Sequence, residues 1–178
     1  MEKINLSNDS LQRAADEEAW KQLSSCSRFL WSESLLEKYK EKVDWKEISS
    51  NGEIRWSIPM LQRFKDRIDW DRLSESICEE SLTEECIDTF IDKWNWSYLS
   101  DNEDLKLTPA ILDKYIDYWD WSRIVERWWE NSFKNIAIEF YERYKKHIPT
   151  DILLDTGLWK AIVDQRRKQI IAEITTQV

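Results

Sequence analysis

Glycine and proline are almost missing from this sequence, whose 178 residues include only two Gly and three Pro. Hairpin-rich sheets, barrels and sandwiches rely on glycine-containing tight turns, so this shortage argues against a β architecture. Long apolar runs are missing as well, because no stretch approaches the roughly 20 residues that cross a bilayer. The opening segment, MEKINLSNDSLQRAADEEAW, has no apolar core of a secretory signal. We therefore expect a cytoplasmic protein.

Residues that carry metal or nucleophilic chemistry are scarce too. His147 is the only histidine, which excludes a poly-His metal site and leaves one residue for any His-based triad. Gly52 and Gly157 stand alone, so no phosphate-binding loop is present. The three cysteines, which we interpret as reduced core thiols, are far apart, at Cys26, Cys78 and Cys86. We expect no metal, no cofactor and no enzymatic activity.

The formal charge of −9 is unevenly distributed along the chain. Residues 134–178 hold 8 Lys/Arg against 6 Asp/Glu, which leaves 18 against 29 for the first 133 residues. An acidic body repels phosphate backbones and anionic lipid surfaces. Neither a nucleic acid nor a membrane is therefore an expected partner. The charge has two readings, a solvated acidic surface or a surface for a basic protein.

A phrase built around tryptophan recurs through most of the chain. The leading tryptophans, at intervals of 25 or 26 residues, are Trp20, Trp45, Trp70, Trp96 and Trp121. An aliphatic residue follows three positions after each, at Leu23, Ile48, Leu73, Leu99 and Ile124. An aromatic residue stands six positions before the last four, at Tyr39, Phe64, Phe90 and Tyr115. Another aliphatic residue stands nine positions before each, at Leu11, Leu36, Leu61, Ile87 and Leu112. Several registers in phase indicate a true internal repeat.

Each unit of the repeat is predicted to contain two helices. The first helix is expected to run for roughly ten residues from a Ser or Thr N-cap. These caps are Ser7, Ser32, Ser57, Thr83 and Thr108. A shorter helix, which carries the leading Trp, is expected to start at a second cap, at Asp44, Asp69, Asn95 or Asp120.

Short helices gain most of their stability by packing, so such units must stack on one another. We predict an all-α fold, a short right- or left-handed α-solenoid of about 25-residue helix–turn–helix repeats in a single domain, 1–178. The units are approximately 6–30, 31–55, 56–81, 82–106, 107–132 and a degenerate 133–158. In the last unit Phe133, Ile138 and Tyr141 keep phase, while Lys134 and His147 replace the cap and the Trp. The apolar spacing over approximately 157–175 predicts an amphipathic helix that closes the open end.

The phrases IRWSIPMLQRFKDRIDWDRLS and LKLTPAILDKYIDYWDWSRI resemble a tandem array found in uncharacterised bacterial proteins. That array has the form L-x-W-S…L-x-x-Y-x-D-x-W-D-W-x-x-L-S-x-N, and the resemblance covers roughly residues 6 to 132. The chain departs from it at SESICEESLT, where one residue is inserted and the Asn is lost, and at VERWWE. The resemblance implies a helical-repeat fold and carries no activity or site residue.

Three classes of function remain open from the sequence. The repeat pattern favours a non-enzymatic module that binds another protein, with an undetermined oligomeric state. The first alternative is a carbohydrate or small-ligand binder, because exposed tryptophan rings stack on sugars and cations. The second is an enzyme with a pair of carboxylates, although the aspartates in the repeat are explained as helix caps. The candidate binding residues lie outside the repeat registers, where Trp and Arg often form interface hot spots: Arg127, Trp128, Trp129 and Trp159.

Overall fold

The computed structural model describes residues 8–127 and 134–176, and every regular element in these ranges is helical. The prediction of an all-α protein is thereby confirmed. Within the same ranges, no helix has the length and apolar character that a bilayer-crossing segment needs. The chain divides into two compact units, Met1–Lys106 and Leu107–Val178.

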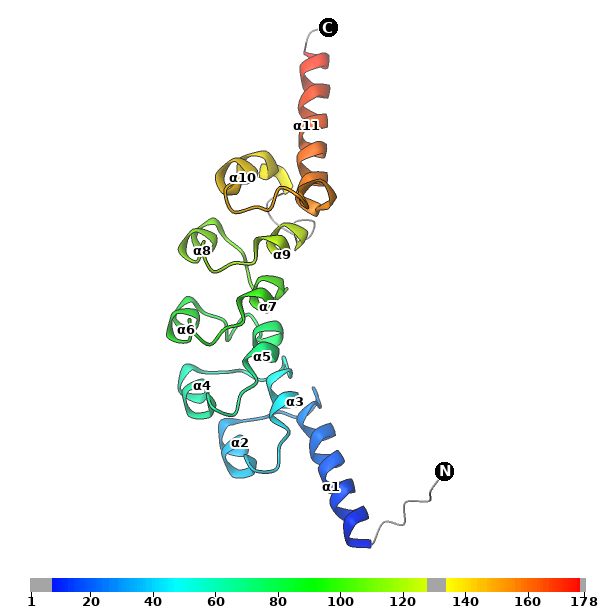
Figure 1. Ribbon diagram of the computed structural model, residues 1–178, viewed down its shortest axis with the longest axis vertical. Helices are drawn as coiled ribbons and strands as arrows, with labels where there is room; N and C mark the ends of the chain where they lie inside the picture. Colours follow the sequence, from blue (N-terminus) through cyan, green and yellow to red (C-terminus); the bar gives the residue numbers. More distant parts are fainter. Residues whose placement is uncertain (1–7, 128–133, 177–178) are drawn as a thin grey trace. The chain divides into compact units, whose positions relative to one another are not determined.

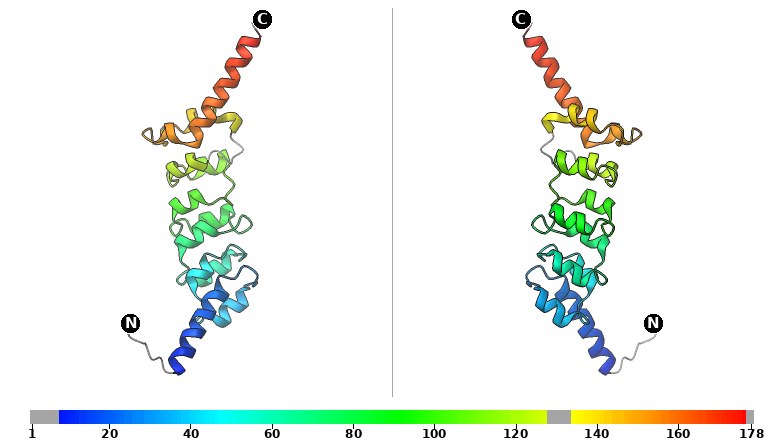
Figure 2. Two further views of the ribbon diagram at one scale, coloured as in Figure 1. Left: turned by 90° about the vertical axis from the view of Figure 1, so that its right-hand side faces the viewer. Right: turned by 90° about the vertical axis from the view of Figure 1, so that its left-hand side faces the viewer.

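The first unit is built from two rows of helices. Its helices are α1 (Asn8–Ser24), α2 (Glu33–Tyr39), α3 (Trp45–Ser49), α4 (Ile58–Phe64), α5 (Trp70–Ser76), α6 (Glu84–Thr89) and α7 (Trp96–Asp101). Figure 1 shows α2, α4 and α6 in one row and α3, α5 and α7 in the other, and Figure 2 shows the same helices from the side. Contacts between successive members join α1, α3, α5 and α7.

The second unit combines a further pair of short helices with longer C-terminal elements. It contains α8 (Pro109–Lys114), α9 (Trp121–Glu126), η2 (Lys134–Ile136), α10 (Ala137–Tyr144), η3 (Leu153–Asp155) and α11 (Gly157–Thr175). α11 contacts α9, α10 and both 3-10 segments. The hydroxyl of Tyr144 donates a hydrogen bond to Asp113, 3.0 Å away, and Arg143 forms an ion pair with the same carboxylate. Burial, followed by this hydrogen bond, raises the pKa of Tyr144 to about 12.

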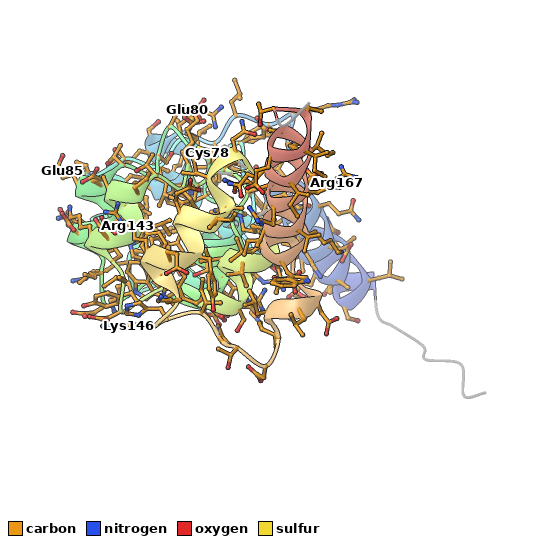
Figure 3. All side chains as sticks on the ribbon, turned by 90° about the horizontal axis from the view of Figure 1, so that it is seen from above. Cys78, Glu80, Glu85, Arg143, Lys146 and Arg167 are labelled. Atoms are coloured by element: carbon orange, nitrogen blue, oxygen red, sulfur yellow. The ribbon has the colours of Figure 1, made fainter. Side chains whose placement is uncertain are left out.

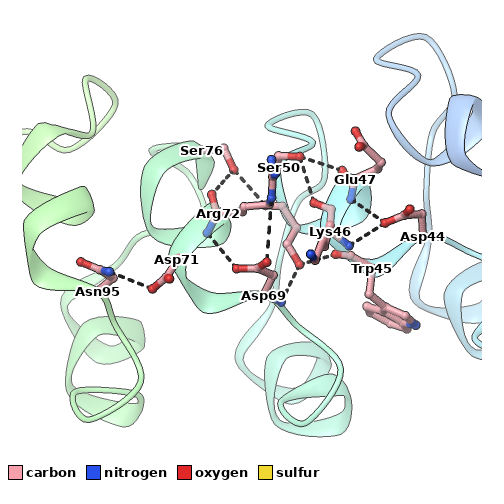
Figure 4. Close-up of polar contacts among 11 residues, drawn as sticks. Asp44, Trp45, Lys46, Glu47, Ser50, Asp69, Asp71, Arg72, Ser76 and Asn95 are labelled. Carbon is pink, nitrogen blue, oxygen red and sulfur yellow. Dashed lines mark hydrogen bonds and ion pairs between the residues drawn. The ribbon is translucent and has the colours of Figure 1, made fainter.

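The predicted N-cap residues start the helices of the repeats. Each first-helix cap accepts the N–H of the residue three positions later, at 3.2 or 3.3 Å, and these caps are Ser32, Ser57, Thr83 and Thr108. The second-helix caps act in the same way, and they are Asp44, Asp69, Asn95 and Asp120. Figure 4 shows the bonds made by Asp44 and Asp69. A side-chain acceptor at this position satisfies one of the free N–H groups of the first turn.

A test of these helix starts compares two threonines around α6. Thr83→Ala is expected to lower the free energy of unfolding by about 1 kcal/mol, because the Cys86 N–H loses its acceptor. Thr89→Ala is expected to be nearly neutral, because Thr89 is exposed and its hydroxyl binds the Glu85 carbonyl oxygen within the same helix. Thermal melts of both variants measure the difference. A larger loss for Thr89→Ala than for Thr83→Ala contradicts the assigned start of α6.

The first repeat differs from the prediction, because a single helix, α1, replaces the expected helix pair. Ala19 occupies the position where later units have an Asp or Asn cap. Alanine offers no acceptor and has the highest helix propensity, so nothing interrupts the helix before Trp20. Leu11, expected in the core, is 55% exposed. The predicted cap Ser7 lies outside the described residues.

The first helices of the later units are also shorter than the predicted ten residues, with six or seven residues each. The carbonyl of the aromatic register residue closes a turn there, as Phe64 does by accepting the N–H groups of Arg67 and Ile68. The next carbonyl, that of Lys65, accepts the indole N–H of Trp70 at 2.9 Å. Equivalent indole bonds of 2.9 to 3.2 Å are made by Trp45, Trp96 and Trp121. The leading Trp thus caps the C-terminal end of the helix before it.

The core follows the predicted registers in the central repeats. Seven aliphatic register residues are completely buried: Leu36, Ile48, Leu61, Leu73, Ile87, Leu99 and Leu112. The tryptophans beside the caps and before the leads are buried too, at Trp31, Trp56, Trp94 and Trp119. The leading tryptophans are half-buried except for Trp121, so each of the others keeps an edge in solvent.

Aromatic pairs connect neighbouring repeats. Each of the first three leading tryptophans packs on the aromatic register residue of the following repeat, with ring centroids 5.1 or 5.2 Å apart, in the pairs Trp20–Tyr39, Trp45–Phe64 and Trp70–Phe90. In the second unit Trp121 packs on Phe140 and Tyr144, and on His147 at 5.6 Å. The degenerate repeat does not keep the expected phase, because Ala137 and Phe140 are buried while Ile138 and Tyr141 are half-buried. The carbonyl of Tyr144, three residues after Tyr141, closes the turn by accepting the N–H groups of His147 and Ile148. Phe133 is outside the described residues.

A second set of connections between repeats is polar and buried. The serines four residues after the first three leading tryptophans, Ser24, Ser49 and Ser74, each donate to the Trp carbonyl and accept the N–H of the next second-helix cap, as Ser74 does at 2.7 and 3.0 Å. Asn102 reaches back to the preceding repeat and donates to the carbonyls of Ser74 and Ile77, at 3.0 and 3.1 Å. At the equivalent position of the repeat with the inserted residue, where the Asn is lost, the hydroxyl of Ser76 donates to the Ser49 carbonyl (Figure 4).

Candidate interaction surface

The four candidate residues from the sequence have different positions in the structure. Trp128 and Trp129 lie outside the described residues. Arg127 is the C-cap residue of α9 and is only 8% exposed, so it is not available as a surface contact. Trp159 is half-buried in the first turn of α11 and lines a groove along that helix. Of the candidates in the described ranges, only Trp159 contributes to this groove.

The N-terminal half of α11 is firmly attached to the second unit. Thr156 caps the helix by accepting the Trp159 N–H at 3.3 Å, and Leu158 is completely buried. Gln165, two turns later, accepts the Ile138 N–H at 3.1 Å and donates to Glu139 at 3.2 Å. These contacts fix the direction of the helix up to residue 165.

From Val163 onward, α11 exposes apolar side chains. The predicted helix is present, with the predicted bounds, but most of the apolar residues expected to close the end of the fold are in solvent. The exposed fractions are 48%, 41%, 55% and 60% for Val163, Ile170, Ile171 and Ile174. In Figures 1 and 2 this part of α11 projects beyond α10. The helix length explains the difference, because α10 and the 3-10 segments reach only its first turns.

A shallow groove runs along the exposed side of α11. Its volume is about 440 Å³, and its lining is Trp159, Ile162, Val163, Arg166, Arg167, Ile170 and Ile171. A second hollow of about 340 Å³ shares Trp159 and Val163 and extends to Lys160 and Asp164. The Trp ring and the aliphatic side chains form an apolar surface, and the arginines flank it. Exposed apolar surface bordered by charge is typical of protein docking sites.

The charges around the groove are arranged in pairs. Arg166 binds Glu173 at 3.1 Å, and Asp164 binds both Arg167 at 2.6 Å and Lys168 at 2.8 Å. The hydrogen bond from Lys168, followed by that from Arg167, lowers the pKa of the Asp164 carboxyl. Figure 3 labels Arg167 on the outer side of α11. All these groups are exposed and exchange partners at little cost.

The thiols and the imidazole in the described part of the chain are at least half-buried. Burial raises the pKa of the Cys86 thiol to about 11, so it stays protonated at neutral pH. Cys78 is buried as well, whereas Cys26, also predicted in the core, is only half-buried. His147 packs against Trp121. Across residues 8–127 and 134–176, no cluster of three His, Cys, Asp or Glu has the geometry of a metal site.

The chain matches no family model, no curated protein and no solved structure. The surface must therefore be interpreted from its own residues. Sequence analysis identified Trp159 but missed the isoleucines and arginines further along α11. The spacing of the isoleucines was visible in the sequence, and these residues were assigned to the core. A periodic pattern shows that one face of a helix is apolar, but it does not show what covers that face.

Proposed function

We propose that this protein is a non-enzymatic interaction module, a short α-solenoid whose C-terminal helix binds a protein partner through its exposed apolar groove. The observation that carries the proposal is the groove on α11, where Trp159 and exposed aliphatic side chains lie between arginines. Contiguous exposed apolar surface with a polar rim marks an interaction site more often than single exposed apolar residues do. A cytoplasmic location and a relationship to the Trp-rich repeat proteins belong to the same proposal.

The remaining features of each unit fit a helical scaffold. Two rows of short helices in the first unit are joined by aromatic pairs, buried serine and asparagine bonds, and surface ion pairs such as Arg63–Glu33. In the second unit, Thr156 and Gln165 hold the start of α11 in a fixed direction. A rigidly held helix loses little conformational entropy when it binds, which favours affinity.

Photo-cross-linking tests this proposal. A photoreactive phenylalanine analogue placed at Ile171 in the groove is expected to give a protein adduct in native cell extract, whereas the same analogue at exposed Lys65 is not. Trp159→Ala and Val163→Lys in the Ile171-labelled chain are expected to lower the adduct yield about tenfold, because the apolar contact is lost. Mass spectrometry identifies the adduct.

A thermal melt accompanies each variant, because Trp159 is half-buried and its loss could weaken the fold. Val163 is 48% exposed, so Val163→Lys is expected to melt like the wild type. An adduct yield at Ile171 no higher than that at Lys65, with all chains folded, overturns the proposed docking surface.

A further inference from the structure

The charges on the exposed part of α11 are self-complementary. Arg166 and Glu173 are seven residues apart, two helical turns, and therefore share one edge of the apolar stripe, where their side chains meet at 3.1 Å. One end of this edge is basic and the other acidic. A second α11 that runs in the opposite direction brings its Glu173 beside Arg166 and its Arg166 beside Glu173. Two such contacts are related by a twofold axis, which is the geometry of an isologous dimer.

The apolar residues fit the same alignment. When Arg166 is level with Glu173 of the second copy, each Ile170 is offset from its counterpart by about 1.5 Å along the helix axis. Val163 is then offset from Ile174 of the second copy by about 3 Å, which is less than one helical turn. The exposed aliphatic side chains of both copies therefore meet in the register that the charges select.

We propose that α11 pairs with α11 of a second copy in antiparallel orientation, with Ile170 at the centre, and that the protein is a symmetric dimer. This inference rests on the proposed function, because it names the partner of the same groove. The intrahelical pair between Arg166 and Glu173 is replaced by two pairs between the copies. Val163, Ile170, Ile171 and Ile174 become covered.

The charges favour a second copy over other occupants. In a parallel pair Arg166 would face its own counterpart, and like charges at an interface are unfavourable. An anionic lipid surface is disfavoured because it would repel the first 133 residues, which hold 18 Lys/Arg against 29 Asp/Glu.

Sedimentation equilibrium of the purified full chain, from about 1 to about 300 µM, measures the association. Arg166→Glu and Glu173→Arg are each expected to raise the dimer Kd about 10- to 30-fold, because each change sets like charges together at two symmetric places. The double variant restores opposite charges and is expected to return the Kd to within about threefold of the wild type. Ile170→Glu, which buries a carboxylate at the centre, is expected to give monomer throughout.

Lys146→Glu is the matched control, because Lys146 is exposed in the same unit and receives the same change of charge (Figure 3). Its Kd is expected to equal that of the wild type. Circular dichroism confirms the helix content of every variant.

Disulfide cross-linking tests the orientation. Ile170→Cys is expected to give a covalent dimer on mild oxidation, because the two positions adjoin at the centre. Val163→Cys is not expected to give a covalent dimer, because antiparallel pairing separates the two copies of residue 163 by about 20 Å. The wild type, which has three native thiols, provides the background.

Several results overturn the dimer. They are a folded monomer over the whole concentration range, a dimer that the charge reversals leave unchanged, cross-linking at residue 163 as efficient as at residue 170, or monomeric chain that binds anionic vesicles. A monomer whose Ile171 adduct contains a different protein rejects the dimer and leaves the proposed function standing. A monomer without any adduct rejects both.

Discussion

Replacing Trp94 by Ala is expected to lower the free energy of unfolding by about 3–5 kcal/mol. Trp94 is only 5% exposed, and its ring meets that of Trp70 edge-on with centroids 5.2 Å apart. Its indole N–H donates to the carbonyl of Ile87 at 3.2 Å. Alanine leaves a cavity and an unpaired buried carbonyl in the middle of the first unit. Chemical denaturation measures the loss.

Two further variants separate buried from half-buried positions. Trp70→Ala is expected to cost about half as much as Trp94→Ala, because the leading Trp keeps an edge in solvent. Lys65→Ala is expected to stay within about 0.5 kcal/mol of the wild type, because the Lys65 side chain is exposed. If Trp70→Ala proves more destabilising than Trp94→Ala, the hydrogen bond from the Trp70 indole to the Lys65 carbonyl contributes more to stability than the burial of the Trp94 ring does.

Much of the fold was predictable because each position of the repeat holds a residue type with one physical role, such as filling the core or capping a helix. Aliphatic residues in phase, such as Leu73 and Leu99, had to face a common interior, and both are completely buried. Ser and Thr before apolar stretches had to cap helices, and Thr83 does so. Periodicity was less informative about tryptophan, whose ring is apolar while its N–H is a donor. Trp70 uses both parts, because its ring packs on the next repeat and its N–H binds Lys65.

Other features of the fold depend on contacts between residues that are far apart in the sequence. The serine and asparagine of the L-S-x-N phrase recur in register, but their hydrogen bonds join residues 20 to 28 positions apart. Such bonds appear only when the stacking of repeats is known. The single helix α1 was predictable, because Ala19 cannot cap a second helix. The exposure of Ile170 and Ile174 was not, because the apolar pattern of α11 is identical whether its partner belongs to the chain or not.

The buried asparagine at position 102 offers the most direct test of the polar contacts between repeats. Asn102 is 2% exposed, donates to the carbonyls of Ser74 and Ile77, and accepts the N–H of Asp104 at 2.9 Å. Asn102→Ala leaves these groups without a partner, and each unsatisfied group costs about 1–3 kcal/mol. We expect a total loss of about 3 kcal/mol or more in chemical denaturation. A loss below about 1 kcal/mol contradicts a structural role for these bonds.

Asn102→Asp should make the same contact sensitive to pH. An ionised carboxylate has no hydrogen to donate and would face two carbonyl oxygens, so the folded state favours the protonated acid and its pKa rises above the unfolded value of about 3.9. The neutral acid donates one hydrogen bond, and this stabilisation is fully present below about pH 4 and is lost as the pH rises through the folded-state pKa. We expect Asn102→Asp to be at least as unstable as Asn102→Ala at pH 7 and to recover stability relative to it toward pH 4. The difference between the two variants, measured by denaturation at a series of pH values, cancels the titration of all other groups. A difference that stays constant over this range would mean that the Ser74 and Ile77 carbonyls do not face this side chain.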